Sequence, residues 1–139
     1  MQFHKTLIFS AIALSASSAM AGAWEHENER GVDLYRAADG NMVVSLVCDP
    51  NTVYGTTESA VLLEAGGDPD LSAEVGFSFP DGNRVNAALV HGRFGKATAN
   101  PVDWETLVDG FRVHQTVTVS RGEAAVEVEL GEPMPFTCL

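Results

Sequence analysis

The stretch "FRVHQTVTVSRGEAAVEVEL" (residues 111–130) predicts an antiparallel β-hairpin. Apolar and polar residues alternate on both sides of Arg121-Gly122, which is the pattern of two half-buried strands joined by a tight turn. With these two residues as the loop, the facing residues are Val119 with Ala124, Val117 with Val126, Gln115 with Val128 and Val113 with Leu130 on a mostly apolar face, and Thr118 with Ala125, Thr116 with Glu127 and His114 with Glu129 on a polar face. A slip of one residue would mix the two faces.

Two more hairpins are predicted around turns that contain glycine. "DG" (residues 39–40) separates "VDLYRAA" from "MVVSLVC", and "PDGN" (residues 80–83) separates "AEVGFSF" from "RVNAALV". The second of these hairpins has an apolar stripe that consists of Val75, Phe77, Phe79, Val85, Ala87 and Leu89. Glycine supplies the positive φ that tight hairpin turns require. "MVVSLVC" is apolar on both faces apart from Ser45, which favours a central strand, and "ESAVLLEA" (residues 58–65) adds a further strand.

One short helix is predicted at about residues 100–109. Asn100 can cap it, and Pro101 suits its first turn. Its sheet-facing stripe would consist of Trp104, Leu107, Val108 and Phe111. Gly110 is expected to end it. The whole pattern predicts an all-β fold, an antiparallel β-sandwich or small barrel with one short helix.

The first 21 residues have the pattern of a cleaved secretory signal peptide. Lys5 precedes the apolar run "TLIFSAIAL", and Ala19 and Ala21 occupy the −3 and −1 positions of a cleavage site. The run is shorter than the roughly 20 apolar residues of a transmembrane helix. We therefore expect a periplasmic or extracellular protein. Its predicted segments are a signal peptide at 1–21, a flexible acidic lead-in at 22–31 and a single β-sandwich domain at 32–139.

The charge of the chain limits its partners. The formal net charge is −11, and removal of the signal peptide takes away Lys5 and no acidic residue, which makes it −12. A nucleic-acid partner would need clustered lysine and arginine, so this composition argues against one. A cationic protein or envelope component is the expected partner, and a second interpretation is that the charge only keeps an exported protein soluble.

The chain contains two cysteines, Cys48 and Cys138. An exported protein meets an oxidising compartment, and an even cysteine count then indicates a disulfide bond. No C-x-x-C spacing suggests a redox role. We therefore predict a structural disulfide between these two residues.

Few residues qualify as catalytic groups, and no catalytic residue is predicted. No G-x-S-x-G motif is present, and none of His26, His91 and His114 has a second histidine at metal-ligand spacing. His114 is expected on the polar sheet face opposite Glu129, and His91 is expected at a strand end where it could contact a ligand. Glu127 and Glu129 form an acidic stripe, which either docks a cationic partner or keeps the sheet from pairing with other chains.

Two metal hypotheses stay open, although no metal or other cofactor is predicted. Cleavage after Ala23 rather than Ala21 would place His26 third from the free amine. The amine, two backbone nitrogens and the imidazole could then enclose Cu(II) or Ni(II) in a square plane. Separately, "DPD" (residues 68–70) could contribute to a Ca²⁺ site, but its spacing does not match an EF-hand loop.

The last third of the chain carries a family resemblance. "WETLVDGFRVHQTVTV" (residues 104–119) is followed by "VEVELGEPMPFTC" (residues 126–138), and an earlier cysteine ends "LVC". With the signal peptide, this pattern resembles small secreted alphaproteobacterial proteins of the invasion-associated locus B type. The resemblance implies an exported β-sandwich and carries over no functional residue. It departs from the family in the first half of the chain, where no close match is seen.

A second resemblance is to the periplasmic lysozyme inhibitors of the C-type family. They are similarly small exported β-barrels with a terminal disulfide, and an acidic surface would suit a basic lysozyme. The Ser-Gly-rich loop associated with that family is missing here. The sequence thus predicts a non-enzymatic binding or envelope-associated module, with lysozyme inhibition, metal binding and a hydrolase as rival hypotheses.

Overall fold

A computed structural model describes residues 23–133, 136 and 138. The predicted signal peptide, with its cleavage site after Ala21, lies outside the described residues. Within them, no helix combines the length and the hydrophobicity that a membrane crossing requires.

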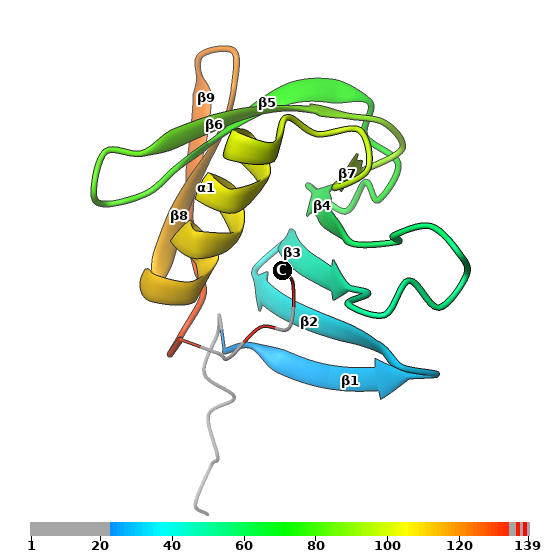
Figure 1. Ribbon diagram of the computed structural model, residues 1–139. Coiled ribbons are helices and arrows are strands. Elements are labelled where there is room, and N and C mark those ends of the chain that lie inside the picture. The colour runs from blue at the N-terminus through cyan, green and yellow to red at the C-terminus, as the bar shows by residue number, and fades with distance from the viewer. Residues whose placement is uncertain (1–22, 134–135, 137, 139) are drawn as a thin grey trace, which may run out of the picture.

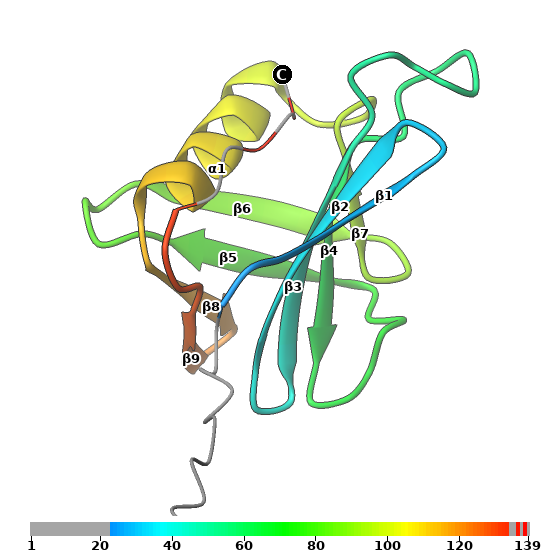
Figure 2. The same ribbon diagram turned by 90° about the horizontal axis from the view of Figure 1, so that it is seen from below.

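Nine strands form two antiparallel sheets in the described part of the chain (Figure 1). The five-stranded sheet has the order β1 (Glu25–Glu29), β2 (Val32–Asp39), β3 (Met42–Cys48), β4 (Ala60–Ala65) and β7 (Arg93–Gly95). The four-stranded sheet has the order β6 (Arg84–Leu89), β5 (Ala73–Ser78), β8 (Thr116–Arg121) and β9 (Ala124–Glu129). Strands of the two sheets run crosswise, as Figure 2 shows. The predicted all-β sandwich is confirmed.

The core lies between the two sheets and under the helix. The predicted stripe of the β5–β6 hairpin is fully buried there: Val75, Phe77, Phe79, Val85, Ala87 and Leu89. β3 is central in its sheet, as predicted, but only one of its faces enters the core. Val43 and Val47 on its other face are only half-buried. The five-stranded sheet therefore keeps an apolar outer face.

Helix α1 (Pro101–Val113) is longer than the predicted 100–109. Asn100 caps it as expected, because its side chain accepts a hydrogen bond from the Val102 N–H at 2.9 Å. Gly110 does not end the helix. It lies buried against Phe79, where a Cβ atom would overlap the aromatic ring. This glycine is therefore needed for close packing, and His114 forms the C-cap instead.

The register of the β8–β9 hairpin differs from the predicted one by two residues. Val119 pairs with Val126, and Val117 pairs with Val128. The loop is consequently Gly122-Glu123 instead of Arg121-Gly122. The first strand of the hairpin is also shorter than predicted, because the helix extends to Val113 and β8 begins only at Thr116. A displacement of two residues keeps each strand residue on its predicted face, since side chains alternate with a period of two.

The segment at 22–31 was predicted to be a flexible lead-in, and that prediction is wrong for its central part. Residues Glu25–Glu29 form β1, which pairs along its length with β2. Trp24 just before it is buried, with edge-to-face contacts to Phe111 and Phe136. The high glutamate content conceals the alternation that places His26 and Asn28 toward β2 side chains.

The predicted disulfide between Cys48 and Cys138 is confirmed. It joins the end of β3 to the end of the chain, and both cysteines are buried. The same terminal segment places Phe136 against Trp24 and Tyr35. The disulfide therefore helps to hold in place the aromatic cluster formed by Trp24, Tyr35 and Phe136.

Candidate interaction surface

β9 is an edge strand, and most of its residues are exposed to solvent. It is the last strand of the four-stranded sheet, and its first four residues, 124–127, are exposed. Val126 keeps 47% of its surface accessible. At the other end, Val128 and Leu130 are buried and fix the strand to the core. β9 is thus held firmly at one end and presented to solvent at the other.

Two hydrogen bonds reveal which way the backbone of β9 points. The Leu130 N–H donates to the Gln115 carbonyl at 2.7 Å, toward β8. The Glu129 N–H donates to Oδ2 of Asp39 at 2.9 Å, away from β8. Because backbone groups alternate sides along a strand, Ala125 and Glu127 also point away from β8. No described residue accepts a hydrogen bond from either of these N–H groups.

The structure brings Glu127 and Glu129 together, as predicted. Both lie on the outer face of the four-stranded sheet, opposite Thr118 and Thr116 respectively. Neither glutamate takes part in a salt bridge among the described residues. Their negative charge is therefore uncompensated by the neighbouring strand.

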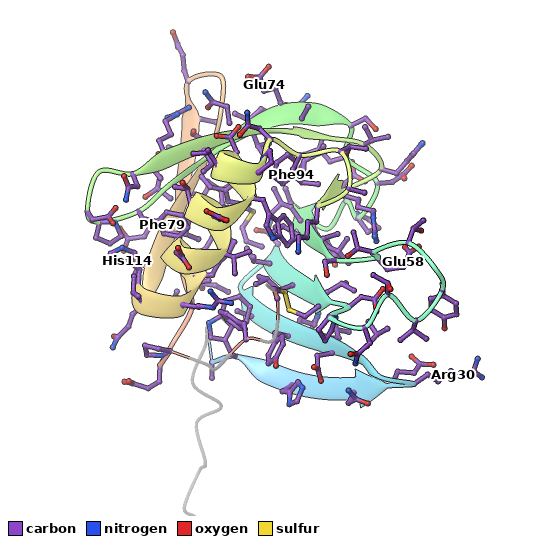
Figure 3. All side chains as sticks on the ribbon, in the orientation of Figure 1. Arg30, Glu58, Glu74, Phe79, Phe94 and His114 are labelled. Atoms are coloured by element: carbon purple, nitrogen blue, oxygen red, sulfur yellow. A yellow bond between two sulfur atoms is a disulfide. The ribbon has the colours of Figure 1, made fainter. Side chains whose placement is uncertain are left out.

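His114 is not opposite Glu129, which corrects the predicted pairing. It caps α1, and its Nε2 lies 3.1 Å from Oδ2 of Asp81 in the β5–β6 turn. Its ring stacks on Phe79, with centroids 5.5 Å apart, and Figure 3 shows the two side by side. The pKa of Asp81 lies below its ordinary value, mainly because its carboxylate accepts a hydrogen bond from the Asn83 N–H. The contact with His114 is the second cause. This histidine joins the helix end to a hairpin and does not belong to the β9 surface.

His91 lies in the turn between β6 and β7, at the predicted strand end. Its Nδ1 is 2.8 Å from Oδ1 of Asp70, and both side chains are largely exposed. The backbone is left-handed at His91, with φ 50°, and the following Gly92 leaves no room for a Cβ beside the Pro69 carbonyl. The "DPD" loop is therefore tied to this turn, far along the chain from Glu127.

His26 is built into β1. Its Nε2 is 2.8 Å from Oδ1 of Asp33, which also accepts a hydrogen bond from Asn28 Nδ2 at 2.8 Å. The ring stacks on Tyr35 with an interplanar angle of 10°. The hypothetical Cu(II) or Ni(II) chelate would need the His26 ring to leave Asp33, and one of the backbone nitrogens of Glu25 and His26 to leave its pairing with β2. No group of three or more metal-ligating side chains occurs among the described residues.

The outer face of the five-stranded sheet carries two open hollows. One is lined by Arg36, Ser45, Leu62, Glu64 and His91 among others, and the second by Val32, Leu34, Val47, Tyr54 and Arg93 among others. Each hollow contains one arginine, and each arginine has an acidic neighbour. Arg93 donates to the Glu58 carbonyl at 2.6 Å and lies 3.3 Å from its carboxylate, while Arg36 pairs in register with Glu25. In these hollows, unlike on β9, an arginine therefore lies beside the acidic side chains.

The sequence predicted the two glutamates of this surface. It did not predict that Asp39 and Val126 also belong to it. Asp39 caps the last outward amide of β9 from a different sheet, and nothing local to either segment indicates this contact. Val126 was expected to face Val117 in the core, but it faces Val119 near the hairpin tip and stays half exposed. Only the register could have revealed its exposure.

Comparisons with protein-family models, with curated proteins and with solved structures find no match for this chain. Function is therefore inferred from the groups that the chain itself presents.

Proposed function

We propose that the protein is an exported, disulfide-stapled binding module without enzymatic activity, and that it holds a cationic protein partner on the acidic β9 edge. One observation carries the proposal: Glu127 and Glu129 project from an exposed edge strand whose neighbour offers only threonines opposite them. Like charges placed side by side without a counter-charge attract cations.

The overall charge supports the same partner class. A chain with a net charge of −11 attracts basic proteins over distances of about 10 Å at moderate salt. Long-range attraction alone would make binding unspecific, whereas a fixed pair of carboxylates on a sheet gives it a location. The proposed role is therefore recognition at β9, assisted by the field of the whole molecule.

The two family resemblances add separate proposals about the partner. The likeness to invasion-associated locus B proteins adds an association with the cell envelope. The likeness to C-type lysozyme inhibitors adds a defined basic partner, and the unpaired glutamates of β9 favour it because they offer carboxylates to a cationic surface. A basic lysozyme is consequently a useful first probe.

The experiment compares two variants with equal changes in charge. Binding of the secreted protein to an immobilised basic lysozyme is measured for the parent, for E127Q/E129Q on β9 and for E25Q/E27Q on β1. Exposed ion pairs contribute about 0.2–1 kcal/mol each, so loss of two should make the β9 variant bind about twofold to thirtyfold more weakly. The β1 variant should bind nearly as the parent does.

Three results would count against the proposal. They are absence of salt-sensitive binding to this probe and to a second basic protein, equal weakening by both variants, or hydrolysis of the probe. Loss of lysozyme activity in the complex would support the inhibitor proposal, and binding without inhibition would limit the role to docking.

A further inference from the structure

We infer that β9 binds its partner by strand addition, as the docking edge for an extended segment in which basic and apolar residues alternate. This inference rests on the proposed function and specifies how the cationic partner is recognised. It makes the partner a fifth strand on the four-stranded sheet, next to β9.

The backbone of β9 is ready for such pairing. Ala125 and Glu127 point their N–H and carbonyl groups away from β8, and both residues are exposed. In an antiparallel pair, a residue opposite each of them would exchange both backbone hydrogen bonds with it. Val128 and Leu130 anchor the strand in the core, so the edge is already in an extended conformation before a partner arrives.

The contact with Asp39 shows that an outward N–H of β9 can donate to an acceptor from outside its sheet. The Asp39 carboxylate takes the hydrogen bond of the Glu129 N–H at 2.9 Å, in the place where the carbonyl of an added strand would lie. Asp39 also comes from the end of β2, which blocks further pairing beyond Glu129. The open part of the edge is therefore limited to residues 124–127.

The side chains of β9 define what the added strand should carry. Residues directly opposite each other in a pair share a face, so a basic side chain opposite Glu127 would lie beside both glutamates. Val126 points to the other face and is 47% exposed, so the intervening residue of the partner would pack on it best with an apolar side chain. The preferred segment thus alternates lysine or arginine with residues such as valine.

A second copy of this chain fits the edge poorly. Self-pairing centred on Ala125 places Glu127 opposite Glu123, pairing centred on Val126 places Glu129 opposite Glu123, and pairing centred on Glu127 places that residue opposite its own equivalent. Like charges directly opposite each other destabilise a strand pair. The glutamates therefore oppose self-association and favour a cationic strand at the same edge.

The test uses a pair of peptides that differ only in which amides are blocked. Both have the sequence Lys-Val-Lys-Val-Lys-Val-Lys with neutral ends. In one the three valine nitrogens are methylated, and in the other the nitrogens of the last three lysines are methylated. If lysines face Glu127, their amides point at β9, so lysine methylation should weaken binding at least tenfold while valine methylation leaves it nearly unchanged. Binding is measured by calorimetry.

Protein variants give the matching control on the other side of the interface. A125P removes an outward N–H on an edge strand, where proline is tolerated, and A125V keeps that N–H. We expect at least tenfold weaker binding of the valine-methylated peptide by A125P and little change for A125V. Amide exchange in the unsubstituted protein provides a readout that does not depend on the fold of a variant: Ala125 and Glu127 should become protected on binding.

Each outcome decides between the two proposals. Equal binding of both methylated peptides, with weakening by E127Q/E129Q, would overturn strand addition and leave charge-based docking in place. Binding of neither peptide, or concentration-dependent dimerisation of the free protein through β9, would also overturn it. Binding that ignores both the methylation and the two glutamates would overturn the proposed function as well.

Discussion

β1 and β9 are both exposed edge strands rich in glutamate, yet different contacts hold them in the fold. β1 is fastened through side chains, because His26 and Asn28 both contact Asp33, and Trp24 before it is buried. Its Glu25 also pairs in register with Arg36. β9 carries its glutamates opposite threonines and points two backbone amides outward. Both strands therefore lie at a sheet edge and carry glutamates that form no salt bridge with any described residue. They differ in that side chains fasten β1 to its sheet, whereas an outward amide of β9 already bonds to an acceptor from another sheet.

Removal of the disulfide should have the largest effect and should act mainly on the β1 side. The bond closes a loop with a sequence separation of 90, for which chain entropy predicts a loss of about 4–5 kcal/mol in C48S/C138S. Urea unfolding measures the loss, and amide exchange locates it. We expect β1 to lose protection before β8 and β9, because Phe136 packs under β1 near the staple. Loss of protection in β9 first would contradict this distinction.

Truncation of the aromatic anchor should be the next largest effect. Trp24 is 7% exposed and contacts two phenylalanine rings, so W24A should lower the free energy of unfolding by about 3–5 kcal/mol. V126A on β9 is the matched control, because that side chain is 47% exposed. It should cost less than about 0.5 kcal/mol. Similar losses in the two variants would show that the edges are equally anchored.

The polar anchor of β1 should contribute less. D33A removes the acceptor shared by His26 and Asn28, which should cost about 1–3 kcal/mol in urea unfolding. D39A removes the acceptor of the Glu129 N–H at a solvent-facing edge, so its cost should be smaller. It should also speed amide exchange at Glu129. An unchanged exchange rate there would argue against Asp39 as the cap of β9.

The smallest expected effect concerns the Asp81 carboxyl, which belongs to neither edge and serves as a reference. Its pKa is lowered from 3.8, chiefly by the Asn83 N–H and then by His114. A lowered native pKa stabilises the fold above pH 3.8, and this contribution is lost as the pH falls through the native value. D81N should therefore be less stable than the parent at neutral pH, and the difference should shrink in acid. A difference that grows in acid would contradict the sign.

Much of the fold could be predicted from local patterns. The stripe from Val75 to Leu89 and the cysteine count led to the observed core hairpin and disulfide, because burial faces and cysteine pairing leave direct traces in the sequence. The β8–β9 register could not be predicted, since a shift of two residues leaves every face unchanged. The end of α1 was also hidden, because Gly110 serves the packing of Phe79, a contact from a distant strand.

Only part of the candidate site could be predicted from the sequence, for the same reason. Glu127 and Glu129 were recognised from their alternation, and their shared face depends only on strand periodicity. The open amides, the Asp39 cap and the partial exposure of Val126 depend on how two sheets meet. His114 was misplaced because its partner Asp81 lies in another hairpin. Non-local contacts of this kind have no signature in a single sequence.

The most direct test of the central claim is amide exchange along β1 and β9 in the unsubstituted protein, with and without the valine-methylated peptide. We predict that the amides of Ala125 and Glu127 become protected on binding, while those of Glu25–Glu29 exchange at unchanged rates. Protection of β1 without protection of β9 would contradict the account.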